Sequence, residues 1–178
     1  MLDTIINENR PTVFRDYAMT RLIAKTGLRE MSVQNAKIED IGIKDDQYIL
    51  WVLVKGHQAK DEFVILTDGL YDDLQNAIDG RPEGYIFVGQ GNKNTGEQLT
   101  KKHINRIITG YMRICQIKTA TNCVHSLRNF YISETLRQGA KVEKVQLAVH
   151  HTDPKTTMGY ARDLERVENP VEAFIRNL

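Results

Sequence analysis

Four short segments of this chain carry side chains that could act on a phosphate ester. His125 and Arg128 stand three positions apart, a spacing that places both side chains on one face of a helix. The other three segments hold Arg29, the pair His150 and His151, and Tyr160. A guanidinium stays charged and binds phosphate bidentately, a histidine exchanges protons near neutral pH, and an activated tyrosine hydroxyl is a nucleophile. Each segment alone is also typical of ordinary surface or core residues, so the hypothesis depends on their combination.

The order and spacing of these segments resemble the catalytic block of the tyrosine recombinases, the phage integrase family. The family pattern runs from TGLR through a lysine in a β-hairpin to HxLR, and then to a histidine followed by T-T-x-x-Y. This chain has all of these in that order, with 22 residues between Arg128 and His151 and eight between His151 and Tyr160. The resemblance covers the chain from Arg21 to Arg162.

The resemblance implies a site-specific recombinase or integrase that cuts and rejoins DNA through a 3′-phosphotyrosyl intermediate on Tyr160. Arg29 and Arg128 are implied to stabilise the charge on the phosphate in flight. His125 is implied to exchange protons with the reacting groups, and His151 to donate a hydrogen bond to the phosphate. The resemblance implies no metal and no nucleotide cofactor, because the phosphotyrosyl bond conserves the energy of the phosphodiester.

The leaving 5′-oxygen needs a proton, which the family takes from a lysine in a β-hairpin. Lys55 directly follows the first predicted strand and matches that position best. Lys60 lies five residues on in the same predicted hairpin and is the alternative.

Three positions depart from the family pattern. The family usually has an acidic residue three positions after the first arginine, where this chain has Ser32; Glu30 instead directly follows Arg29. Either Glu30 or another group supports Arg29, or the support is weaker. The histidine that often follows HxLR is Asn129 here, and the glycine that usually precedes the second histidine is His150. The spacing to Tyr160 favours His151, and not His150, as the histidine that faces the phosphate.

None of these departures removes a residue that the chemistry uses directly, so the resemblance favours an active enzyme. The alternative from another class is a non-catalytic DNA-binding domain that kept the fold. The alternatives within the same chemistry are a type IB topoisomerase-like and a resolvase-like activity.

The sequence pattern predicts that the elements positioning these residues form an α+β fold. This fold is mostly helical, with a small three-stranded antiparallel sheet in the N-terminal third. Helices are expected at about 12–25, 30–35, 70–78, 100–115, 124–138 and 142–149, with a further one from 153 that carries Tyr160. Strands are expected at 48–54, 63–66 and 85–88. Helix ends are marked by Gly27 and Gly139, and helix starts by Thr100 and by Asp153 before a proline.

Charge is distributed unevenly along the chain, although the net charge is only +1. Residues 61–100 contain two basic and eight acidic residues, a net charge of −6, whereas residues 101–178 contain thirteen basic and seven acidic residues, a net charge of +6. Within the predicted helix at 100–115, Lys102, Arg106 and Arg113 fall opposite the apolar positions. They are candidate DNA-binding residues, although charge clustering alone is also typical of solvated faces.

The chain has 178 residues, of which 41% are hydrophobic, enough for one domain with its own core. The resemblance implies that residues 1–178 are a single catalytic domain without the family's N-terminal DNA-clamping domain. Residues 161–178 correspond to the family's C-terminal segment, which docks on a neighbouring subunit. Candidate anchors are Val171, Phe174 and Ile175, and packing on their own domain is the alternative.

The partners implied by the resemblance are double-stranded DNA with paired recombination half-sites and further copies of the chain. A homotetramer is expected on DNA, and a monomer for the isolated domain. The N-terminus lacks a signal peptide and the apolar run at 48–54 is too short to span a bilayer, so we expect a cytoplasmic, nucleoid-associated protein of bacterial or phage origin, with no membrane partner. Cys115 and Cys123 fit no zinc pattern and are expected to be buried thiols.

Overall fold

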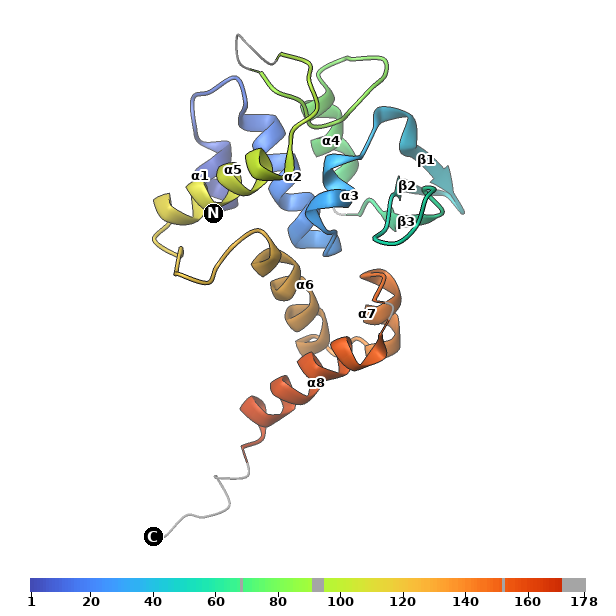
Figure 1. Ribbon diagram of the computed structural model, residues 1–178, viewed down its shortest axis with the longest axis vertical. Coiled ribbons are helices and arrows are strands. Elements are labelled where there is room, and N and C mark those ends of the chain that lie inside the picture. The colour runs from blue at the N-terminus through green and yellow to red at the C-terminus, as the bar shows by residue number, and fades with distance from the viewer. Residues whose placement is uncertain (68, 91–94, 152, 171–178) are drawn as a thin grey trace.

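The computed structural model describes residues 1–67, 69–90, 95–151 and 153–170. It confirms the α+β class: a three-stranded antiparallel sheet of order β1-β2-β3 lies at one side of the helices, on the right in Figure 1. The elements are α1 (Leu2–Ile6), α2 (Val13–Thr26), α3 (Glu30–Gln34), a 3-10 turn (Ile38–Asp40), β1 (Ile41–Lys44), β2 (Gln47–Val52), β3 (Glu62–Ile65), α4 (Leu70–Ile78), α5 (Lys101–Ile114), α6 (His125–Arg137), α7 (Val142–Ala148) and α8 (Pro154–Glu168). None of the described helices is long and apolar enough to cross a membrane.

Two buried apolar clusters divide the molecule. The larger cluster joins α2, α4, α5 and the sheet, and the smaller one joins α6, α7 and α8. Helix α6 runs from one to the other, as Figure 1 shows: Val124, at its N-cap, belongs to the larger cluster, whereas Ile132 and Leu136 belong to the smaller. The first turns of α6, which carry the HxLR segment, therefore lie where the two clusters meet.

The third strand of the sheet is not the predicted segment at 85–88; that expectation was wrong. The third strand is β1, which pairs with β2 through a two-residue turn at Asp45 and Asp46, both with positive φ (48° and 60°). Residues Ile86 and Phe87 are buried in the larger cluster without joining the sheet. The Arg81 guanidinium donates to the carbonyls of residues 85 and 86 at 2.6 and 2.7 Å, which occupies groups that a strand ladder would use.

The predicted helix ends are confirmed where they matter for the site. Gly27 ends α2 at φ 65°, and the Thr100 hydroxyl accepts the His103 amide at the start of α5. The Asp153 carboxylate accepts the Lys155 amide at 2.9 Å at the start of α8. These local caps fix where the helices of the site begin and end.

Cys115 and Cys123 are free thiols but half-buried rather than buried, because one follows the end of α5 and the other precedes α6. Helix α8 continues to Glu168, so residues 161–168 of the expected tail are helical. The candidate anchors Val171, Phe174 and Ile175 lie outside the described residues, and docking of the tail stays a prediction.

Candidate active site

One cavity at the junction of the two clusters collects the predicted catalytic residues, apart from Arg128, which is buried and does not line it. It has a volume of about 420 Å³ and is lined by Arg29, Lys55, Gly56, His125, His150, His151, Asp153, Thr156 and Tyr160. A neighbouring hollow of about 300 Å³ shares three of these residues and adds Leu28, Glu30, Met31, Lys101 and Val124. Side chains more than 100 residues apart in the sequence therefore face a common space.

Arg128 is the buried centre of the junction, with a relative exposure of 1%. Its Nη1 donates to the Gly27 carbonyl at the end of α2, and its Nη2 donates to the Val149 carbonyl after α7 at 2.6 Å. Burial, and next the charge of Arg29, lower the pKa of Arg128 to about 10, which leaves it charged at neutral pH. One side chain of α6 thus ties together the two segments that carry Arg29 and the histidine pair.

The close approach at this point requires glycine at position 27. Gly27 has φ 65°, in the left-handed region, and a Cβ there would lie 2.6 Å from Tyr131 Cδ1 and 3.0 Å from Val149 Cγ1. The glycine of the TGLR segment therefore ends α2 and lets its carbonyl reach Arg128.

Arg29 lies at the N-cap of α3, half-buried, and burial lowers its pKa. Its Nη1 donates to the carbonyl of His150 at 3.5 Å. Ser32 does not support Arg29, because its hydroxyl donates to the Leu53 carbonyl at 2.7 Å. Among the described residues, the buried Oε1 of Glu30 has no hydrogen-bond partner. The support for Arg29 thus comes from a backbone carbonyl rather than from the acidic position that the family uses.

His150 occupies the position of the family's glycine and keeps a conformation that suits glycine, with φ 52°. Its Nδ1 lies 3.4 Å from the Glu62 carboxylate at the start of β3. Its backbone carbonyl is the acceptor for Arg29. The side chain of His150 therefore contacts the sheet while its backbone orients an arginine.

His151 faces the cavity with one ring nitrogen occupied. Its Nδ1 lies 2.8 Å from the hydroxyl of Thr157, which is fully buried on α8. Burial, followed by the charges of Arg128, Arg29 and His125, lowers the pKa of His151 to about 4. The ring is therefore neutral at pH 7, and Nε2 is the nitrogen left to meet a ligand.

His125 opens α6 and contributes to both hollows. More than a third of the residue stays exposed, yet partial burial, with the charges of Arg128 and Arg29, lowers its pKa. A neutral imidazole at this position can accept a proton.

The two candidate lysines have different surroundings. Lys55 is exposed in the loop between β2 and β3 and lines both hollows beside Arg29. Lys60 instead forms an ion pair with Asp40 and donates to the Asn35 carbonyl at 2.7 Å. The loop thus brings Lys55, and not Lys60, to the cavity.

Tyr160 lies on α8 and lines the cavity, and its hydroxyl donates to Oδ1 of Asn129 at 2.7 Å. In the sequence, Asn129 is notable only as a departure from the family pattern. Lys101, which lines the second hollow, is not among the predicted site residues. The only signal for Lys101 in the sequence is its place directly after the Thr100 cap, as the first residue of α5. In the structure α5 packs against α3.

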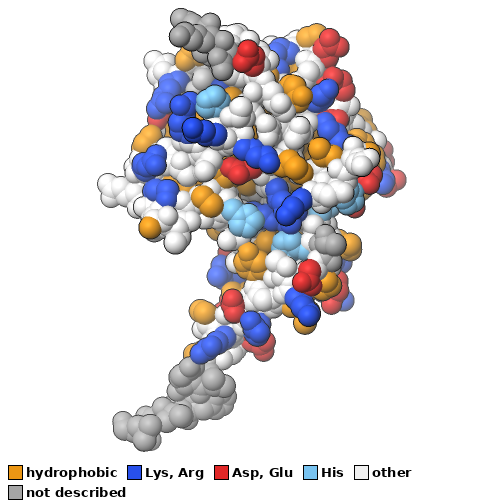
Figure 2. All heavy atoms as spheres, viewed as in Figure 1, with side chains coloured by type: hydrophobic (Ala, Val, Ile, Leu, Met, Phe, Trp, Pro, Cys, Tyr) orange, Lys and Arg blue, Asp and Glu red, His pale blue; other side chains and the backbone are white. Residues whose placement is uncertain are grey.

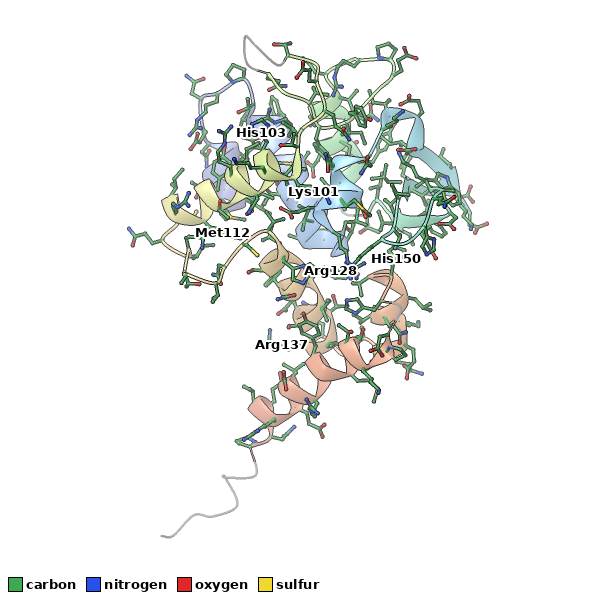
Figure 3. The ribbon with its side chains drawn as sticks, viewed as in Figure 1. Lys101, His103, Met112, Arg128, Arg137 and His150 are labelled. Atoms are coloured by element: carbon green, nitrogen blue, oxygen red, sulfur yellow. The ribbon has the colours of Figure 1, made fainter. Side chains whose placement is uncertain are left out.

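The three candidate DNA-binding residues of α5, Lys102, Arg106 and Arg113, are all exposed. Figure 2 shows Lys and Arg side chains at the upper left and centre of the visible face, and histidines near its middle, above the narrower lower part. In Figure 3, Lys101 on α5 lies above Arg128 and His150, which mark the junction. The cavity therefore opens beside basic side chains.

Fold and site together define an α+β domain in which an arginine, a lysine, three histidines and a tyrosine line one cavity. The chain matches the Phage integrase family over residues 1–166 and belongs to that family. It is 30% identical over 149 residues to a tyrosine recombinase of Pseudothermotoga lettingae, covering 82% of this chain and 49% of the relative. It is also 30% identical over 151 residues to tyrosine recombinase XerA of Pyrococcus furiosus, covering 83% and 50%. The chain thus spans about half the length of these curated relatives.

Solved structures share the fold at low sequence identity. A XerH site-specific recombinase bound to a palindromic difH substrate, in a post-cleavage complex, superposes with a TM-score of 0.77 at 19% identity, covering 96% of this chain and 50% of that one. A lambda integrase dimer bound to a COC′ core site gives a TM-score of 0.67 at 15% identity, covering 93% and 46%. The likeness at this identity concerns the fold.

Proposed function

We propose that this chain cuts and rejoins DNA strands at specific sites through a 3′-phosphotyrosyl intermediate, with Tyr160 as the nucleophile. The observation that carries the proposal is the shared cavity, which Tyr160 lines together with Arg29, Lys55, His125 and His151. Family membership supports the same chemistry. The proposed partner is double-stranded DNA with paired half-sites, on which four copies assemble.

The first step forms one bond and breaks another. The Tyr160 oxygen bonds to phosphorus as the bond from phosphorus to the 5′-oxygen breaks. The phenol proton passes to neutral His125, and the leaving 5′-oxygen takes a proton from Lys55. A 5′-hydroxyl from another strand reverses both changes, which restores the phosphodiester and the free tyrosine.

The remaining groups stabilise charge on the phosphate. Arg29 presents a guanidinium to the cavity, and Arg128 adds a fixed positive charge behind it. His151 Nε2 donates to a non-bridging oxygen once the ring carries a proton there. Preorganised donors of this kind act in a partly water-excluded site, where electrostatic stabilisation is strongest.

The test of the nucleophile uses a pool of nicked duplexes with a randomised core, because a nick lets the short 5′ fragment diffuse away and traps the covalent complex. The full-length protein is expected to form an SDS-resistant adduct, and Tyr160→Phe to form none. Tyr85→Phe is the matched control, because Tyr85 lies away from the cavity beside Lys37. No adduct with the wild type, or an adduct with Tyr160→Phe, would contradict the proposal, and relaxation of supercoiled DNA without strand exchange would indicate a topoisomerase-like activity.

The general acid is tested with a substrate whose leaving 5′-oxygen is replaced by sulfur. Lys55→Ala is expected to slow adduct formation on ordinary DNA by roughly 10²- to 10⁴-fold. The sulfur substrate should restore the rate, because a thiolate leaves without a proton. Lys60→Ala is the control. It should lower the stability of the protein through the loss of the Asp40 ion pair, but its rate of adduct formation should not increase on the sulfur substrate. Rescue of Lys60→Ala instead of Lys55→Ala would reverse the assignment.

The basic face of α5 is tested by salt dependence. Replacing Lys102, Arg106 and Arg113 together by alanine is expected to reduce the slope of log affinity against log salt by up to about 3, since each phosphate contact contributes about 0.9. The comparison is a variant with alanine at Lys141 and Lys144, which are exposed on or next to α7. Equal slopes for the wild type and the triple variant would show that the three side chains face solvent on DNA.

A further inference from the structure

The hydroxyl of Tyr160 already has a partner in the absence of DNA. It donates a hydrogen bond to Oδ1 of Asn129, with a separation of 2.7 Å between the two oxygens. The bond joins α8 to α6, and both residues are half-buried. Asn129 directly follows Arg128, so the helix turn that holds the buried guanidinium also holds the nucleophile.

We propose that Asn129 is the positioning residue of the nucleophile: it orients the Tyr160 hydroxyl and accompanies it through loss of the proton. The inference rests on the proposed function. It concerns a group that does not touch the phosphate and acts only through Tyr160. It assigns a role to a position where this chain departs from the usual family pattern.

The chemistry of a carboxamide fits both protonation states of a phenol. The amide oxygen accepts a hydrogen bond from the phenol but is too weak a base to take its proton, so the proton stays available for His125. After the proton has left, rotation of the amide by half a turn presents Nδ2–H to the phenolate oxygen. Asparagine can therefore hold the oxygen of Tyr160 before and after ionisation, whereas an aspartate can hold only the protonated form.

The charged groups near the Tyr160 hydroxyl explain why a neutral amide at position 129 matters. The ionisable groups that face the cavity or lie behind it come from α3, the β2–β3 loop, α6 and the turn before α8: Arg29, Lys55, His125, Arg128, His150, His151 and Asp153. Arg29, Lys55 and Arg128 are cationic, the three histidines have lowered pKa values, and Asp153 is the acidic exception. A carboxylate in place of the Asn129 amide would add a like charge at hydrogen-bond distance and oppose ionisation.

The experiment measures single-turnover adduct formation by the full-length protein on saturating nicked DNA from pH 6 to pH 10. Asn129→Asp is expected to move the rising limb of the pH–rate profile to higher pH by about one unit or more. Asn129→Ala, which loses one hydrogen bond, is expected to slow the step on the order of tenfold at every pH. Asn129→His offers one donor and one acceptor nitrogen and should stay within about threefold of the wild type.

A matched control and a DNA-free measurement complete the test. Ser133→Ala changes a half-buried residue one turn further along α6 and should leave rate and profile unchanged. In protein labelled at tyrosine Cζ, the resonance of Tyr160 is identified by its absence in Tyr160→Phe and should shift in Asn129→Ala without any DNA. Wild-type rate, profile and resonance in both Asn129→Ala and Asn129→Asp would overturn the inference. If the wild type forms no adduct but the resonance still shifts, the proposed function fails while the contact stands.

Discussion

Replacing Arg128 by methionine is expected to lower the free energy of unfolding by about 2–4 kcal/mol and to reduce adduct formation by at least about a hundredfold. The stability loss follows from the two carbonyls that Arg128 satisfies, those of Gly27 and Val149, since a buried acceptor without a donor costs about 1–3 kcal/mol. The activity loss follows from removal of the fixed charge behind the phosphate. Both quantities are measured on one preparation, by urea unfolding and by the nicked-duplex assay.

Arg137→Met is the matched control, because it makes the same substitution on the same helix. Arg137 is exposed and forms an ion pair with Glu134 at 2.6 Å, which contributes at most about 1 kcal/mol. We expect its unfolding midpoint and adduct rate to be close to those of the wild type. An Arg128→Met variant as stable as Arg137→Met would show that the two carbonyls find other donors and that the residue does not hold the junction together.

Replacing Arg29 by methionine is expected to leave the free energy of unfolding within about 1 kcal/mol while slowing adduct formation on the order of 10²- to 10³-fold. Arg29 is only half-buried, and its bond to the His150 carbonyl is long, at 3.5 Å. Arg29 lines both hollows, so we expect its contribution to fall on the reaction and not on the fold. Urea unfolding and single-turnover adduct kinetics measure the two effects separately.

Arg29→Lys refines this prediction. Lysine keeps the positive charge but lacks the planar fork that binds two phosphate oxygens at once. We therefore expect it to recover only part of the rate lost in Arg29→Met. If Arg29→Met lowered the free energy of unfolding as much as Arg128→Met does, the two arginines would not differ in their roles, one in the reaction and the other also in the fold.

Short-range patterns in the sequence predicted much of the local structure of this protein. The three-residue spacing of His125 and Arg128 places them on α6, and the Gly27, Thr100 and Asp153 signals mark helix ends as the structure has them. These features depend on neighbours within about one helical turn, which the chain itself supplies. The order of the motifs along the chain also identified the family, before any contact between them was known.

Long-range packing decided the features that the sequence left open. The failed third strand is one example, because burial of residues 86 and 87 and the Arg81 contacts kept an apolar segment out of the sheet. The choice between the lysines is another, since Lys60 finds Asp40 only once the loop folds against the start of β1.

The site itself depends most on tertiary structure. Arg128 reaches a carbonyl 101 positions away, and Asn129 on α6 contacts Tyr160 on α8. No local pattern encodes such pairs, because each requires two surfaces that become neighbours only when the apolar clusters close around α6. The sequence by itself determined which groups could react; the tertiary structure decided which carbonyls hold the arginines, which lysine faces the cavity and which amide holds the tyrosine.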